Sequence, residues 1–230
     1  MNEAALRTLV GEADLFRDLD PITWDAITQA ATHCVIPRAT SLFTQGDEAT
    51  NLFLVVEGRL KVGLVTADGA PLAVRFMEPG DLVGCAAVFR RVPYPATATA
   101  VVDTIEMSWT TRQIEVMIQS HPKMAANALA IMGGRAEEFL RRFREAATER
   151  VEQRIARTLL RLRRRSNADD RGQRFTLRMS RQDLAEFSGA TLYTVSRTLS
   201  AWKREGIVEG GRGRITISDA RKLIEVAHTP

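Results

Sequence analysis

Residues 180–205, SRQDLAEFSGATLYTVSRTLSAWKRE, constrain the fold more than any other stretch of this chain. Apolar residues recur at helical spacing on both sides of Gly189, so two short helices can share one core around a tight turn. Ser180 can cap the first helix, with Asp183 in the place of the capping-box acid, and Thr191 can cap the second. This pattern predicts a helix-turn-helix. The expected buried positions are Leu184, Ala185, Phe187, Val195, Leu199 and Trp202.

The opposite face of the second helix carries polar and basic side chains on adjacent turns. We expect Arg197 to read a base edge, because a guanidinium presents two parallel donors that match O6 and N7 of guanine. Arg181, Gln182 and Lys203 stand at the ends of the two helices, where they can meet phosphates. The alternative is that these are solvated side chains of an ordinary helical hairpin. The expected DNA-binding residues of the two helices are Arg181, Gln182, Thr191, Leu192, Tyr193, Thr194, Ser196, Arg197, Ser200 and Lys203.

Residues 207–217, IVEGGRGRITI, follow this motif and predict a β-hairpin, because the glycines permit a tight turn. A hairpin in this place makes the motif a winged helix-turn-helix. We expect Arg212 and Arg214 on the wing to lie near phosphates. Asp219 then caps a last short helix.

The charge of the chain is unevenly distributed. Residues 1–147 contain 14 Lys or Arg against 18 Asp or Glu, whereas residues 148–230 contain 18 against 10. A basic second half that carries the two-helix motif is typical of a DNA-binding domain attached to another domain. A chain of 230 residues is long enough for two modest domains. It contains neither an apolar run of about 20 residues nor a signal peptide, so we expect a cytoplasmic protein without membrane association.

Two other classes of protein are disfavoured. The sequence has no phosphate-binding glycine loop, no metal-binding His/Cys spacing and no nucleophile motif, so we expect no enzymatic activity. A regulatory cyclic-nucleotide module of an enzyme or channel would leave the basic motif without a role. The cysteines, Cys34 and Cys85, are expected to be reduced thiols and are too few for a four-cysteine iron-sulfur cluster.

The first half of the chain changes pattern near Cys34. Before it, residues 1–31 read as short helices, with Asp20 as a cap followed by Pro21, and with Trp24 and Ile27 at buried positions. After it, short runs rich in Val, Leu and Phe alternate with turn signals and predict a small all-β barrel or roll that ends near Trp109. The turn signals are Gln45-Gly46-Asp47, Glu57-Gly58, Ala67-Asp68-Gly69 and Pro79-Gly80-Asp81.

A long helix is predicted from Pro122, with apolar residues spaced alternately by four and three positions over about three heptads. Such a seam favours a parallel homodimer. The alternative is that the helix packs on the roll through Ala128, Ile131 and Leu140, and both arrangements can hold at once. The expected dimer-interface residues are Ala125, Leu129, Met132, Ala136, Phe139, Phe143 and Ala146.

We therefore expect an α+β protein with three parts. These are a sensor domain over residues 1–121, a dimerisation helix over residues 122–147, and a winged helix-turn-helix DNA-binding domain over residues 148–230. The apolar seam gives way to charge at residues 148–150, which we expect to act as a hinge.

This order of parts resembles the Crp/Fnr family of bacterial transcription regulators. The resemblance implies that the roll is a jelly roll like a cyclic nucleotide-binding domain. It also implies a homodimer on double-stranded DNA, with one recognition helix per half-site of a palindromic promoter site, and a contact with RNA polymerase. The resemblance rests on Gln45-Gly46-Asp47, Glu57-Gly58, Pro79-Gly80-Asp81-Leu82-Val83-Gly84, Arg154-Ile155-Ala156-Arg157-Thr158-Leu159-Leu160, and residues 180–199.

Departures from the family pattern exclude some of the effectors that the family is known to use from those expected here. Members that bind cyclic nucleotides carry a glutamate, an arginine and a serine where this chain has Cys85, Pro95 and Ala96. Without the arginine, the negative charge of a bound phosphate would be poorly compensated, so cyclic AMP is disfavoured as the effector. The cluster cysteines of the oxygen-sensing branch are also missing. In the recognition helix, Tyr193 stands where many relatives carry a glutamate, so the base pairs it faces should be less tightly specified.

Two phrases, TLYTVSR at residues 191–197 and PYPATA at residues 93–98, look like the NnrR and DNR branch of the family, which activates denitrification genes in response to nitric oxide. That resemblance suggests a haem between the roll and the long helix. The axial ligand stays open among His33, His121, His228, the cysteines and a methionine, and we expect Cys85 to be a core residue. The alternative is a regulator of another effector or of none. The expected pocket residues are Val83, Gly84, Cys85, Ala86, Val88, Phe89, Tyr94, Pro95, Ala96, Leu129 and Met132.

Overall fold

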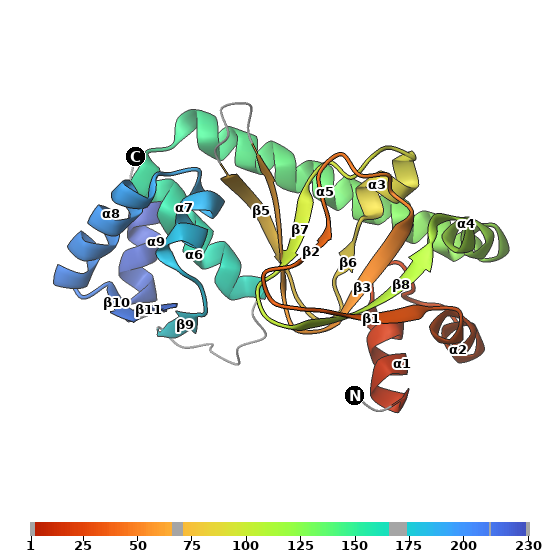
Figure 1. The fold of residues 1–230 in the computed structure, drawn as a ribbon. Coiled ribbons are helices and arrows are strands. Elements are labelled where there is room, and N and C mark those ends of the chain that lie inside the picture. Colours follow the sequence, from red (N-terminus) through yellow and green to blue (C-terminus); the bar gives the residue numbers. More distant parts are fainter. Residues whose placement is uncertain (1–2, 66–70, 166–173, 212, 229–230) are drawn as a thin grey trace. The chain divides into compact units, whose positions relative to one another are not determined.

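The structure is a computed structural model that describes residues 3–65, 71–165, 174–211 and 213–228 (Figure 1). The chain divides into two compact units, residues 1–138 and 139–230, and the long helix α5 (Pro122–Thr148) begins in the first and ends in the second. Within the described ranges, no helix combines the length and the hydrophobicity needed to span a membrane.

The first unit is built around two four-stranded antiparallel sheets, with strand orders β1-β8-β3-β6 and β2-β7-β4-β5. They form the predicted roll, and its last strand, β8, ends one residue after Trp109. The strands are β1 (Thr32–Ile36), β2 (Ser41–Phe43), β3 (Asn51–Glu57), β4 (Leu60–Val65), β5 (Pro71–Met77), β6 (Leu82–Val83), β7 (Thr97–Ala100) and β8 (Thr104–Thr110). The helices before α5 are α1 (Glu3–Glu12), α2 (Pro21–Gln29), α3 (Cys85–Arg90) and α4 (Thr111–Ser120).

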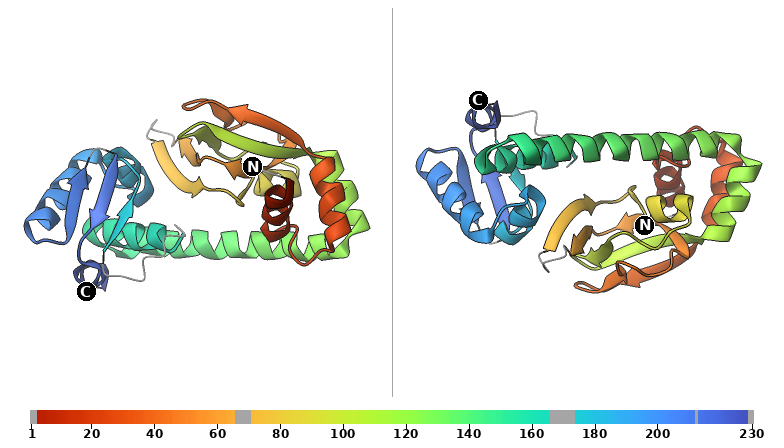
Figure 2. Two further views of the ribbon diagram at one scale, coloured as in Figure 1. Left: turned by 90° about the horizontal axis from the view of Figure 1, so that it is seen from below. Right: turned by 90° about the horizontal axis from the view of Figure 1, so that it is seen from above.

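Two hydrophobic cores hold this unit together. One lies between the sheets and includes Phe43, Val55 and Tyr94. The other lies where the helices pack on the roll and contains Phe16 and Trp109, whose rings meet edge to face at 5.0 Å. Figure 2 shows α1 beside the first half of α5, and Ala128 and Ile131 of α5 pack against this second core. These contacts confirm that α5 packs on the roll through Ala128 and Ile131, whereas the same expectation for Leu140 is wrong, because Leu140 is 64% exposed.

Several elements differ from the sequence-based expectation. Helices α3 and α4 were not predicted from the sequence. Helix α3 has six residues, which is too short to show a periodic pattern, and it starts after Gly84 at φ 93°. Helix α4 begins with a capping box of Thr110 and Gln113. This local signal could have been read from the sequence.

The second unit contains the predicted winged helix-turn-helix. Two residues separate the end of α5 from the start of helix α6 (Val151–Arg165), and a three-stranded antiparallel sheet has the order β10-β11-β9. The hairpin of β10 and β11 is the predicted wing, whereas β9 was not anticipated. The remaining elements are β9 (Phe175–Leu177), α7 (Arg181–Ser188), α8 (Leu192–Arg204), β10 (Val208–Gly211), β11 (Arg214–Ile217) and α9 (Ala220–His228).

Candidate nucleic-acid interface and effector region

The turn between α7 and α8 is fixed by its capping residues. The Ser180 hydroxyl accepts from Asp183 N at 3.0 Å, and the Asp183 carboxylate accepts from Ser180 N at 2.9 Å. Gly189 ends α7 in the left-handed region at φ 62°. The Thr191 hydroxyl accepts from Thr194 N at 3.1 Å and so begins α8. The three predicted caps are therefore present, and they set the direction in which α8 leaves the turn.

Helix α8 has one buried and one exposed face. Val195, Leu199 and Trp202 are buried, as predicted. On the other face, the Arg197 side chain is exposed and Tyr193 is 73% exposed. This face therefore presents a guanidinium and a phenol to a partner. It also includes Leu192 and Ser200, which are exposed, and Ser196, which is half-buried.

Four of the expected DNA-binding side chains already have partners within the unit. The hydroxyls of Thr191 and Thr194 lie 2.9 Å apart within the cap. Ser200 Oγ donates to Ser196 O at 2.8 Å. In addition, Gln182 Nε2 donates to Glu186 Oε1 at 3.0 Å, so its amide oxygen remains available. These residues would need to share or exchange a hydrogen bond on meeting DNA.

Three basic side chains and one acidic side chain, that of Glu209, are among the residues that line a hollow beside α8. It has a volume of about 320 Å³ and lies between the start of α7, the second half of α8 and the wing. Arg181, Lys203 and Arg214 contribute to its lining, and all three are exposed. The exposed face of α8 therefore adjoins a basic rim, which is the arrangement that a DNA backbone requires. Arg212, also expected on the wing, lies outside the described residues.

The helix-turn-helix is linked to the start of α6 by two arginines for which the sequence predicted no functional role. Arg154 donates to the carbonyl oxygens of Ser188 and Gly189, at 3.2 and 3.3 Å, and to that of Glu149 at 3.2 Å. Arg157 pairs with the Glu149 carboxylate at 3.0 Å. A cation on the last carbonyls of α7 satisfies groups that a helix end leaves unpaired. These bonds connect Glu149, which lies between α5 and α6, to the turn that precedes α8.

The residues expected to line an effector pocket divide between the two cores. Val83 and Tyr94 lie in the core between the sheets, whereas Cys85 and Val88 lie in the core against the helices. The burial of Cys85 confirms its expected place in the core. Of the other expected residues, Ala96 is buried, Gly84, Ala86 and Phe89 are half-buried, and Pro95 is exposed.

Tyr94 fills part of the interior of the roll. Its ring stacks on Phe43 with centroids 3.8 Å apart. Its hydroxyl donates to Asn51 O at 2.6 Å and accepts from Asn51 N at 3.2 Å. Burial raises the pKa of Tyr94, so the hydroxyl stays protonated and keeps both bonds.

One residue of α5 that was expected to line the effector crevice does not face the roll. Leu129 is 75% exposed, so the expectation that it lines a crevice against the roll is wrong. Its neighbours Ala128 and Ile131 make that contact, because their positions lie on another face of the helix. Met132 is half-buried.

The histidines do not gather near these residues. His33 is exposed on β1, at the opposite edge of its sheet from β6 and Val83. His121 follows α4, and His228 ends α9 in the other unit. Within the described ranges, no three His, Cys, Asp or Glu side chains are grouped to hold a metal ion. The packed residues around Tyr94 and the scattered histidines do not fit a haem.

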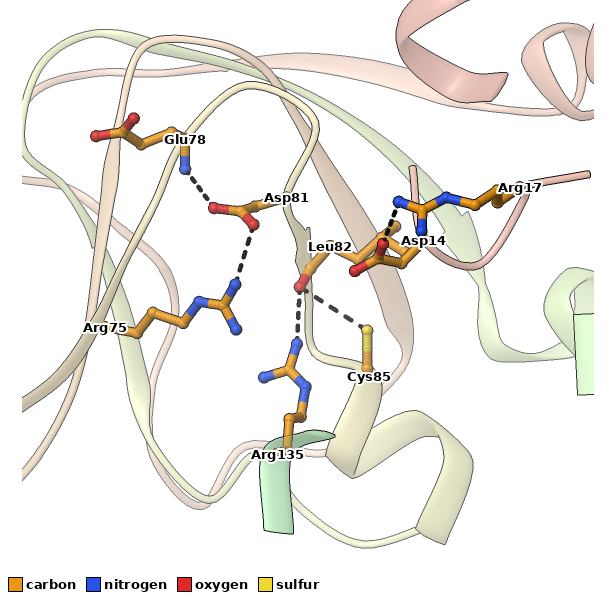
Figure 3. Close-up of polar contacts among 8 residues, drawn as sticks. All are labelled: Asp14, Arg17, Arg75, Glu78, Asp81, Leu82, Cys85 and Arg135. Atoms are coloured by element: carbon orange, nitrogen blue, oxygen red, sulfur yellow. Dashed lines mark hydrogen bonds and ion pairs between the residues drawn. The ribbon is translucent and has the colours of Figure 1, made fainter. Parts of the chain in front are cut away.

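A polar network crosses from the roll to α5 (Figure 3). Asp81 accepts from Glu78 N at 2.9 Å and from Arg75 Nη2 at 3.1 Å. The next carbonyl, Leu82 O, accepts from Arg135 Nη2 at 3.2 Å and from Cys85 Sγ at 3.8 Å. Burial raises the pKa of Cys85, although Arg135 acts in the opposite direction.

Helix α5 carries an exposed apolar stripe. Leu129, Phe139 and Phe143 are 75%, 68% and 66% exposed, and Leu140 beside them is 64% exposed. Ala125 and Ala136 are exposed on the same stripe, and the side chain of Ala146 lies outside those that the structure describes. Large apolar side chains in this pattern, one heptad position after another, leave a surface that water solvates poorly.

Known proteins share both units. Residues 33–121 match the family model of the cyclic nucleotide-binding domain, and residues 153–226 match that of the Crp-like helix-turn-helix domain. The cyclic AMP receptor protein of Thermus thermophilus is 28% identical over 93% of this chain and 96% of its own length. The CRP-like cAMP-activated global transcriptional regulator of Mycobacterium tuberculosis is 23% identical over 94% of this chain and 96% of its own. Among solved structures, FixK2 from Bradyrhizobium japonicum has the same fold, with a TM-score of 0.76 at 23% identity over 87% of this chain and 98% of that chain.

Proposed function

Because the chain belongs to the Crp/Fnr family of DNA-binding transcription regulators, we propose that it acts as a homodimer on an inverted-repeat promoter site. One observation carries this proposal. The exposed face of α8, with Arg197 at its centre, starts at a capped turn and adjoins the basic hollow lined by Arg181, Lys203 and Arg214. In this proposal α8 enters the major groove, and the basic rim meets the flanking phosphates.

The exposed stripe on α5 supports the homodimer. Pairing the stripes of two copies would cover Leu129, Phe139 and Phe143 in each, and a seam of this period matches parallel paired helices. Two-fold symmetry would then place the two α8 helices in half-sites about one helical turn apart. On a promoter, such a dimer is also proposed to contact RNA polymerase.

Selection from a pool of random duplexes tests the DNA-binding proposal. We expect the enriched sequences to contain an inverted repeat, with a guanine at the same position of each half-site. Sedimentation of the complex with the selected duplex should give two protein chains per duplex. Enrichment of a single, asymmetric site, or of no sequence at all, would contradict the proposal.

We also propose that cyclic AMP is not the effector. Cys85, Pro95 and Ala96 stand where a ligand phosphate and ribose would need a carboxylate, a guanidinium and a hydroxyl. In addition, the Tyr94 ring occupies the space beside Phe43 within the roll. Calorimetric titration with cyclic AMP should give no heat of binding. Tight, saturable binding would contradict this part of the proposal.

Control by nitric oxide through haem, with denitrification genes as targets, stays a prediction from the resemblance. The residues expected to line a haem pocket are packed in two separate cores, and this packing does not support haem binding. Titration of the purified protein with haem provides the test. A Soret band that shifts with nitric oxide, together with a changed DNA affinity, would support it. A spectrum of free haem alone would mean that the protein does not bind haem. It would then respond to another effector or to none.

A further inference from the structure

The hollow beside α8 has an apolar floor. Four buried side chains contribute to its lining, each between 3% and 5% exposed, and they come from four segments of the unit. These are Met179 before α7, Leu199 on α8, Val208 on β10 and Ile215 on β11, with the wing beside α8 in Figure 1. A volume of about 320 Å³ is within the range of roughly 300–1,000 Å³ that is usual for small-molecule sites. The hollow is therefore large enough for a small organic ligand.

The rim of the hollow is positively charged. Arg181, Lys203 and Arg214 are exposed, and none of them makes an ion pair with a residue that the structure describes. The carboxylate of Glu209, which also contributes to the lining, pairs with Arg174 at 2.9 Å. The negative charge of Glu209 is therefore already balanced, and the rim presents a net positive charge to a ligand.

Floor and rim favour different parts of a ligand. Phosphates of DNA can meet the exposed cations, but a charged and hydrated backbone supplies little apolar surface for the floor. An apolar group that enters the hollow gains about 25 cal/mol for each Å² of apolar surface removed from water. An anionic group on the same molecule gains charge-assisted hydrogen bonds from the rim. The hollow therefore fits a molecule that is apolar at one end and anionic at the other.

We propose that this hollow binds a small amphipathic carboxylate, with an acyl chain or one or two rings as its apolar body, and that the bound ligand excludes DNA. The body lies on Leu199 and Ile215, and the carboxylate accepts from Lys203 and Arg214. The same two cations are assigned to DNA phosphates in the proposed function, so ligand and DNA compete for them. The competition rests on that proposed function, whereas ligand binding does not.

The competition needs no signal from the roll. All residues of the hollow belong to the second unit, and its lining comes from the same helices and wing that are proposed to contact DNA. A ligand that occupies the site of the phosphates lowers the apparent DNA affinity by mass action alone. The ligand is therefore expected to release the regulator from its promoter site.

Calorimetric titration of the full chain, without DNA, tests the site. The probes are octanoate and 2-naphthoate, with acetate and 1-octanol as controls that carry only the charge or only the apolar body. We expect saturable binding of at least one of the two amphipathic carboxylates, and binding at least about tenfold weaker for both controls. Failure of both carboxylates to bind would overturn the proposal. Equal affinity for 1-octanol and octanoate would also overturn it, because the cations would then have no role.

Variants locate the bound ligand. Replacing two rim cations together, Lys203→Gln with Arg214→Gln, should weaken carboxylate binding at least about fivefold. Arg204→Gln is the matched control, since Arg204 is the next residue of α8 and is exposed but does not line the hollow. It should change the affinity by less than about twofold. Undiminished affinity in the double variant would place the ligand elsewhere, for example on the exposed stripe of α5, and would overturn the assignment.

Fluorescence anisotropy with the selected inverted repeat tests the competition in the wild-type chain. The carboxylate that binds more tightly, at ten times its Kd, should weaken DNA binding by about tenfold. Acetate at the same concentration and ionic strength should change it by less than about twofold. A carboxylate that binds the chain but leaves DNA affinity unchanged would overturn the competition. A chain that binds no duplex would refute the proposed function, and the calorimetric titrations would still decide the ligand site.

Discussion

At the scale of single residues, Arg197 carries the proposed base reading. It is exposed, and the capped start of α8 fixes the direction of the helix that presents it. We expect Arg197→Ala to weaken binding to the selected site by about 1–3 kcal/mol and to remove the preference for one guanine per half-site. Fluorescence anisotropy with the selected duplex and with guanine-substituted duplexes measures both effects.

Arg181→Ala is the matched comparison, because Arg181 is also an exposed arginine of the same motif but lines the hollow beside the wing. This change should weaken binding to all duplexes to a similar extent and reduce the salt dependence. If Arg197→Ala gave the same uniform loss, Arg197 would be a phosphate contact and another residue would read the base.

Glu106 gives the roll a predicted pH dependence. Its side chain is 3% exposed, and burial raises the pKa from an ordinary value of 4.5 to about 7, although the hydrogen bond from Ser108 lowers it. The neutral carboxyl is therefore favoured by folding. Its contribution to stability is complete below about pH 4.5 and is lost as pH rises through about 7.

We therefore expect the free energy of unfolding to fall by on the order of 2 kcal/mol between pH 5 and pH 8, and Glu106→Gln to remove most of this fall. Urea denaturation of the two proteins at both pH values gives the comparison. The same pH dependence in the variant would mean that other groups cause it.

At the scale of elements, the helix-turn-helix could be predicted because its signals are local. Ser180, Gly189 and Thr191 each act within a few positions of the chain, so the sequence already contained the boundaries of α7 and α8. Helix α3 escaped prediction because six residues show no period, and its place depends on the packing of Cys85 and Val88 in the second core.

The cap of α7 leads to a stability prediction. Ser180→Ala removes the oxygen that accepts from Asp183 N and should lower the free energy of unfolding by about 1 kcal/mol. Ser200→Ala is the control, since its hydroxyl bonds to a carbonyl within the same helix and it should change stability by less than about 0.5 kcal/mol. Urea denaturation measures both variants, and equal losses would contradict the role of the cap.

At the scale of the whole molecule, the stripe on α5 decides the proposed oligomeric state. Phe139→Glu would place a carboxylate in a paired seam, and we expect it to weaken dimerisation at least tenfold. Ala130→Glu introduces the same charge at an exposed position of α5 outside the stripe and should leave the dimer intact. Sedimentation equilibrium measures both dissociation constants. A wild-type chain that is monomeric at all concentrations would contradict the seam assignment.

The sequence by itself determined the DNA-binding unit, the order of the parts and the roll, because caps, turns and apolar periods act over a few residues. It also predicted the stripe on α5, since a heptad period can be read along one helix. Only the tertiary structure decided what surrounds the expected effector pocket. Whether Tyr94 meets Phe43, which face of α5 meets the roll, and whether Arg135 lies near Arg75 depend on contacts between segments far apart in the chain. Such contacts are set by the packing of complete sheets and helices, for which a single sequence carries no local signal.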